Sequence, residues 1–99
     1  MSWIASVCSG GMVLASAGLL TGRRATTNRA CFEDFRPLVG ELIDARVVDD
    51  GDVITAGALS CGLDLGLHLV DRFVGSQAAQ DISRSLEYPP PVGDQAAVR

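Results

Sequence analysis

The segment Ser6-Val7-Cys8-Ser9-Gly10 has the residue types and the spacing of a nucleophile elbow. An apolar run ends at Val7 and glycines follow the cysteine, so Cys8 stands where a buried strand turns into a helix. The nucleophile of an elbow holds a strained backbone conformation, which requires small residues two positions before and after it. Ser6 and Gly10 meet this requirement, and Gly11 relaxes it further.

An elbow at this position would make Cys8 a catalytic nucleophile. The dipole of the following helix favours the thiolate. The backbone N–H groups of Ser9 and Gly10 would bind an oxyanion. The alternative is that Cys8 is a small buried hydrophobic residue at the end of a strand. The residue pattern alone leaves both interpretations open.

His68 is the second candidate for chemistry. Asp64 precedes it by four residues and Asp71 follows it by three, so all three share one helical face. Three ligands on one helix cannot surround a metal ion. We therefore favour a structural histidine that is hydrogen-bonded to a neighbouring carboxylate, and we expect no metal and no organic cofactor.

Three cysteines without a Cys-x-x-Cys pair argue against a zinc site or a disulfide scaffold, and free thiols fit a reducing cytoplasm. The acidic run Asp49-Asp50-Gly51-Asp52 could suggest calcium, but no glutamate closes a twelve-residue loop. An Asp-Gly pair between two β-rich runs is a hairpin signal instead.

These residues must be positioned by an alternation of strands and helices, which predicts an α/β fold. Parallel strands, one hairpin and flanking helices are expected. The leucine-rich helix near the C-terminus should be buried on most sides, with an apolar stripe at Leu59, Leu63, Leu67, Val70 and Val74. The predicted elements are a strand over 3–7, a helix over 12–20, a strand over 23–27, a helix over 28–39, a hairpin over 46–55, and helices over 59–74 and 76–87, with Gly75 and Ser76 as caps.

The composition excludes several classes of function. Twelve acidic and eight basic residues give a net charge of −4, so we expect no nucleic-acid partner. The uncharged stretch from Ser2 to Gly22 lacks a basic start and is diluted by glycine and serine, so we expect no signal peptide and no membrane span. Residues 1–88 are expected to form one partial domain, followed by a mobile proline-rich tail over 89–99.

Two runs carry a family resemblance. The run from Val7 to Thr27 (VCSGGMVLASAGLLTGRRATT) resembles the elbow segment of the DJ-1/PfpI superfamily, and the run from Val53 to Val70 is similar to a second segment of that family. The similarity is greatest to isonitrile hydratase-like proteins and to the amidase-like domain of AraC-type regulators. It implies the C-terminal half of a flavodoxin-like sandwich, commonly dimeric, related to the class I glutamine amidotransferases.

The resemblance also implies roles for single residues. Cys8 matches the family's elbow cysteine, and Ser9 stands where the hydratases carry a threonine. The family domain is about twice this length, so the acid that partners the cysteine is expected to lie outside this sequence. Many members carry a histidine after the second threonine, where this chain has Asn28, which cannot take a proton.

The function that the resemblance implies is cysteine-based hydration of an isonitrile to an N-formamide, with a small-molecule substrate and self-association of the chain. We expect the half-domain to be inactive by itself. The alternatives are a ligand-sensing domain of an AraC-type regulator, a redox protein that oxidises Cys8 to a sulfinate, and a non-catalytic truncated fragment.

Overall fold

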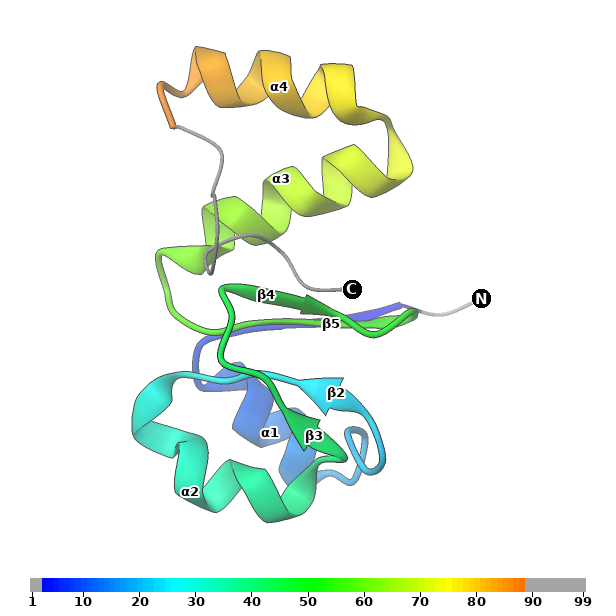
Figure 1. Ribbon diagram of the computed structural model, residues 1–99, viewed down its shortest axis with the longest axis vertical. Helices are drawn as coiled ribbons and strands as arrows, with labels where there is room; N and C mark the ends of the chain where they lie inside the picture. The colour runs from blue at the N-terminus through cyan, green and yellow to red at the C-terminus, as the bar shows by residue number, and fades with distance from the viewer. Residues whose placement is uncertain (1–2, 89–99) are drawn as a thin grey trace.

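The computed structural model describes residues 3–88 and has an α/β architecture around a three-stranded sheet (Figure 1). The strands lie in the order β1-β5-β4, with β1 parallel to β5 and β4 antiparallel to it. The predicted combination of parallel strands and a hairpin is therefore confirmed. The bounds of these strands are Ile4–Val7 for β1, Val47–Asp49 for β4 and Val53–Ala56 for β5.

The hairpin between β4 and β5 forms at the predicted Asp-Gly pair. Gly51 has a φ of 87°, in the left-handed region that favours glycine. Asp50 N–H donates to the carbonyl of Val53 over 2.8 Å, which closes the turn. The predicted tail over 89–99 lies outside the described residues.

A second, two-stranded parallel sheet consists of β2 (Arg24–Ala25) and β3 (Glu41–Leu42). The predicted strand over 23–27 is thus shorter than expected, because the backbone beyond Ala25 pairs with a side chain. Thr26 N–H donates to Thr55 Oγ1 over 2.8 Å.

Two predicted helices are corrected by the structure. The helix expected over 12–20 is α1, Gly10–Ser16, and it ends early because Gly18 turns the chain with a φ of 79°. The helix expected over 28–39 is three short pieces, because Pro37 supplies no N–H donor for a continuing helix. These pieces are η1 (Arg29–Cys31), α2 (Phe32–Phe35) and η2 (Arg36–Leu38).

The long C-terminal helix buries a different face from the one predicted. Helix α3, Cys61–Phe73, buries Cys61, Asp64, Leu65 and His68. The predicted stripe fails at both ends, because Leu59 and Val74 are 82% and 73% exposed. Two of the four buried side chains are polar. The buried face is therefore determined by charged partners on β4 and in the loop before it, and not by the apolar periodicity of the helix.

The turn after α3 agrees with the expectation at Gly75 and differs from it at Ser76. Gly75 directly follows the C-cap residue Val74, as predicted, and its N–H donates to the carbonyl of Val70 over 2.9 Å. Its φ of 139° lies in the range that favours glycine, and α4 (Ser76–Ser85) begins at the next residue. Ser76 is the first residue of α4, and its hydroxyl donates to Asp71 Oδ1 over 2.5 Å instead of capping the helix.

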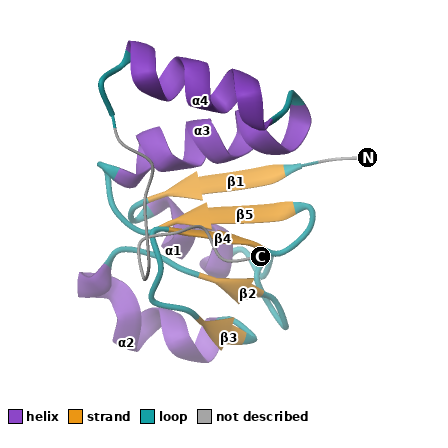
Figure 2. Cartoon of the chain, turned by 45° about the horizontal axis from the view of Figure 1, so that its top comes forward, coloured by secondary structure: helices purple, strands orange, loops and turns teal. Residues whose placement is uncertain are grey.

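The helices lie on both faces of the sheet, α1 and α2 on one side and α3 and α4 on the other (Figure 2). One apolar core joins the sheet to α1 and α2 around the fully buried Phe35. The other joins β4, β5 and α3 around Ile54 and Leu65. Within residues 3–88, no helix is long and apolar enough to cross a membrane.

Candidate functional site

Cys8 has the backbone of an elbow nucleophile. It lies between the end of β1 at Val7 and the start of α1 at Gly10, and its φ is 55°. A non-glycine residue in this left-handed region costs about 1–3 kcal/mol and persists only where the surroundings enforce it. The predicted strand-to-helix elbow is therefore present.

Three hydrogen bonds hold the strained residue in place. Cys8 N–H donates to the carbonyl of Ala56 on β5 over 3.0 Å. The carbonyl of Cys8 accepts from Thr27 Oγ1 at 3.0 Å and from Gly11 N–H at 3.3 Å. Thr27, which sequence analysis gave no role, is therefore a positioning residue for the elbow. The only feature of the sequence that pointed to Thr27 is its position at the end of the run from Val7 to Thr27, which resembles the DJ-1/PfpI superfamily.

The predicted demand for small residues is met, but it is strongest at a different glycine. A Cβ on Gly10 would lie 3.7 Å from Ser6 Cβ, which is ordinary contact. A Cβ on Gly11 would lie 3.0 Å from Thr26 O and 3.1 Å from Thr27 Oγ1. Gly11 thus does not relax the elbow; it allows the backbone of α1 to approach Thr26 and Thr27.

Replacing Gly11 with alanine is therefore expected to lower the free energy of unfolding by about 1–3 kcal/mol, because the new methyl group has no room. The matched control is Gly66→Ala on α3, where nothing lies within 4 Å of the new Cβ. There the free energy of unfolding should rise by up to about 1 kcal/mol, from helix propensity. Urea unfolding of both variants makes the comparison, and equal effects would contradict the crowding at Gly11.

The surroundings of Cys8 are polar and partly open. Cys8 is half-buried and Ser9 is exposed, and the Ser9 side chain makes no capping hydrogen bond to α1. Within the described residues, the buried atoms Ser6 Oγ and Asn28 Oδ1 have no hydrogen-bond partner. Ser6 lies two residues before Cys8. Asn28 directly follows Thr27, whose hydroxyl donates to the carbonyl of Cys8. Buried polar atoms without partners are uncommon in proteins, so these two distinguish the surroundings of Cys8 from the rest of the core.

No acid or base accompanies Cys8 in the part of the chain that the structure describes. Neither a carboxylate nor the imidazole of His68 hydrogen-bonds to it there. His68 Nε2 instead lies 2.7 Å from Asp49 Oδ2, with both side chains buried. The prediction that a carboxylate partners the histidine is thus confirmed. The carboxylate is that of Asp49 on β4, however, and not that of Asp64 or Asp71 on the same helix.

Arg72 completes the buried group on β4. Its Nη1 donates to both carboxylate oxygens of Asp49 over 2.8 Å. Its guanidinium also lies 4.6 Å from the ring centre of Trp3, which meets Phe73 edge-on. Sequence periodicity gave no sign of this arrangement, because it joins β4 to the far end of α3.

The pKa of Asp49 reflects this environment. Burial opposes ionisation, but the hydrogen bond with His68, the Gly51 N–H and the charge of Arg72 outweigh it, so the pKa lies below its ordinary value. The hydrogen bond from Arg23 is the main cause that lowers the pKa of Asp50, with a further contribution from Arg24.

These shifts predict acid sensitivity. A carboxyl whose pKa is lower in the folded than in the unfolded chain stabilises the fold above the ordinary aspartate pKa of about 4. That stability is lost as the pH falls through the lower folded-state pKa. We expect the free energy of unfolding to fall steadily below pH 4, and Asp50→Asn to flatten part of the decline. Unfolding measured from pH 7 to pH 2.5 checks this, and parallel curves for the two proteins would contradict it.

Within residues 3–88, no cluster of three or more candidate ligands could hold a metal ion. Cys31 and Cys61 are free thiols, like Cys8, but only Cys8 has the elbow conformation. On α3, nothing in the described structure lies within 4 Å of a Cβ built at Gly62 or at Gly66, so neither glycine marks a closely packed contact within residues 3–88.

This chain is similar in sequence and in fold to several known proteins. The model of the DJ-1/PfpI family matches residues 1–72. The isonitrile hydratase of Pseudomonas putida is 43% identical over 89 residues, which cover 89% of this chain and 39% of that protein. This chain therefore spans about two fifths of the length of that relative.

Solved structures agree with the arrangement of the elements. A ThiJ/PfpI family protein from Pseudomonas syringae has a TM-score of 0.79 at 36% identity, covering 91% of this chain and 37% of its own. DJ-1beta of Drosophila melanogaster has a TM-score of 0.79 at 23% identity, covering 88% of this chain and 47% of its own. The second likeness is one of fold alone.

Proposed function

The chain belongs to the DJ-1/PfpI family, and from this membership we propose that Cys8 is the nucleophile of an isonitrile hydratase-type reaction. The family and its flavodoxin-like α/β fold are those that the sequence predicted. The substrate class is a proposal, supported by the 43% identity to the Pseudomonas putida isonitrile hydratase.

The observation that carries the proposal is the φ of 55° at Cys8. Strained backbone held by neighbouring groups is concentrated at functional positions. Thr27, Ala56 and Gly11 hold this residue, and the half-buried thiol stands at the end of a strand. In the described chain neither Cys31 nor Cys61 has a positive φ or stands at the end of a strand.

The reaction proceeds in two steps. The Cys8 thiolate forms a C–S bond to the isonitrile carbon, and an acid delivers a proton to that carbon, which gives a thioimidate. Water then adds to the same carbon, a proton moves to nitrogen, and the C–S bond breaks. The products are the free thiol and an N-substituted formamide, so isonitrile and water are consumed one for one.

Ser9 and the elbow backbone have separate roles in this scheme. The exposed Ser9 hydroxyl positions the water, and the N–H groups of Ser9 and Gly10 stabilise the oxygen of the intermediate. No carboxylate hydrogen-bonds to Cys8 within residues 3–88, and we propose that the proton comes from an acid outside residues 1–99. Residues 1–99 alone are then expected to be inactive. The outer edge of β1 has no strand partner in the described part, which favours self-association of the isolated chain.

A chimera tests the proposal. Residues 1–99 replace the matching segment of the Pseudomonas putida isonitrile hydratase, and conversion of n-butyl isonitrile to N-butylformamide is followed by chromatography. The chimera is expected to turn over, and residues 1–99 alone are not. A folded chimera without activity would overturn the proposed substrate class, and activity of residues 1–99 alone would overturn the need for an outside acid.

A further inference from the structure

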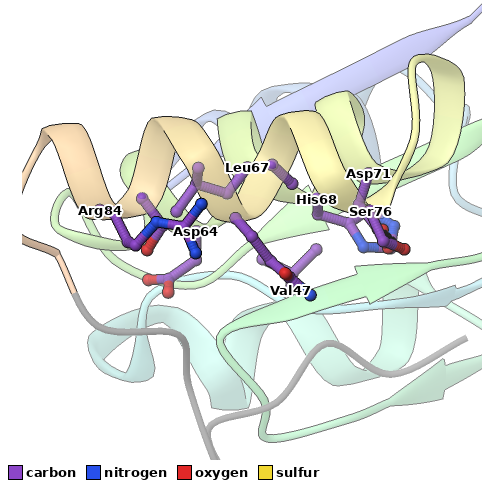
Figure 3. A pocket seen from close by; sticks show the side chains of 10 residues that line it. Val47, Asp64, Leu67, His68, Asp71, Ser76 and Arg84 are labelled. Atoms are coloured by element: carbon purple, nitrogen blue, oxygen red, sulfur yellow. Dashed lines mark hydrogen bonds between the residues drawn. The ribbon is translucent and has the colours of Figure 1, made fainter.

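We propose that the cavity between β4, α3 and α4 binds a small organic cation, a primary alkylammonium. The cavity has a volume of about 450 Å³, within the range of small-molecule sites. Figure 3 shows Asp64, His68 and Asp71 on α3 and Ser76 and Arg84 on α4, with Val47 on β4 beneath the helices. Leu67, Ala79, Gln80 and Ser83 complete the lining.

Asp64 is the main polar group of this cavity. It is only 5% exposed, although it carries a carboxylate. Its Oδ2 accepts from Arg46 Nε at 2.8 Å and from the Tyr88 hydroxyl at 2.9 Å. Its Oδ1 is buried and has no hydrogen-bond partner in the described residues. A buried acceptor left unpaired is costly, and a donor on a ligand would remove that cost.

The hydroxyl groups of the lining also require a donor. Ser76 Oγ gives its proton to Asp71 Oδ1, and Ser83 Oγ gives its proton to the carbonyl of Tyr88. Both oxygens then keep lone pairs and have no proton left to donate. Together with Asp64 Oδ1, they are acceptors, which suits an ammonium group with its three N–H donors.

The other residues of the lining indicate the shape and the charge of the rest of the ligand. Val47, Leu67 and Ala79 are apolar and would contact a short alkyl chain. The Asp64 carboxylate pairs with Arg46, and ionised carboxylates such as those of Asp64 and Asp71 only accept hydrogen bonds, so they offer no donor to an anion. The one arginine of the lining, Arg84, is largely exposed and forms an ion pair with Asp81. A primary ammonium group on a branched alkyl chain fits this combination.

This site is separate from the elbow, because Cys8 and its neighbours do not line the cavity. The inference therefore does not rest on the proposed function. Cys8→Ala should leave alkylammonium binding unchanged while it removes the reaction, so either proposal can fail alone.

The test is an NMR titration of ¹⁵N-labelled residues 1–99 with 3-methylbutylammonium, at constant pH and ionic strength. The neutral comparison is 3-methylbutanol, and the anionic one is 4-methylpentanoate. We expect saturable shifts at the amides of α3 and α4 with the ammonium compound alone. Equal binding of the alcohol would overturn the assignment of the carboxylate as its partner, and absence of ammonium binding would overturn the site.

Two variants and one control sharpen the titration. Asp64→Asn removes the charge of the acceptor and should raise the Kd at least about tenfold, because a charge-assisted hydrogen bond is lost. Ala79→Leu adds side-chain volume to the cavity and leaves Asp64 in place, so it should abolish binding. It decides the question even if Asp64→Asn does not fold. Asp44→Asn, at an exposed pair with Arg29, should change nothing. An unchanged Kd in Ala79→Leu would place the ligand elsewhere and overturn the proposal.

Discussion

Replacing Cys8 with alanine in the chimera should lower the rate of N-butylformamide formation at least about a thousandfold, because the reaction loses the atom that bonds to the isonitrile carbon. Alanine is as small as the elbow requires, so the fold should be unchanged by circular dichroism. The loss should appear in kcat, measured as formamide release at saturating isonitrile.

Cys31→Ala is the matched control for this substitution. Cys31 is half-buried like Cys8, but it lies in the short segment before α2 and has no elbow conformation. Its removal should leave the rate within about twofold. A chimera that keeps its rate without Cys8, or that loses it without Cys31, would show that the wrong thiol has been assigned.

The second large effect concerns stability. Asp49→Asn should lower the free energy of unfolding by about 3 kcal/mol at pH 7, because His68 and Arg72 lose the negative partner of a buried group. Denaturant unfolding measures this change. The result should be insensitive to salt, since Asp49 is only 4% exposed.

The control for Asp49→Asn is Asp44→Asn, which breaks an exposed ion pair with Arg29. Such pairs contribute little, so the free energy of unfolding should stay within about 0.5 kcal/mol of the parent value. If both variants cost the same, the buried group on β4 does not stabilise the fold as described.

Local chemistry made parts of this structure predictable from the sequence. The elbow at Cys8 follows from the small residues around that cysteine, and the hairpin at Gly51 follows from an Asp-Gly pair between β-rich runs. Both features are decided within a few residues, so sequence patterns indicate them directly.

Long-range pairing decided what the sequence did not predict. The buried face of α3 is set by Asp49 and Arg46, which bind His68 and Asp64 from distant segments. An apolar stripe is a poor guide where polar residues are buried by such partners. Likewise Thr27 holds the elbow from 19 residues away. The role of Cys8 as a nucleophile stays a prediction.

The most direct test of that role is the mass of the enzyme during turnover. The chimera is mixed with n-butyl isonitrile, quenched in acid within the first turnovers and digested with trypsin. No lysine occurs in residues 1–99, and the arginines place each of the three cysteines in its own peptide, that of Cys8 ending at Arg23. We expect the mass of one isonitrile to be added to the Cys8 peptide, and its disappearance when the substrate is exhausted. Two results would contradict the account. One is formamide production while the Cys8 peptide stays unmodified throughout. The other is an adduct on the peptide of Cys31 or Cys61.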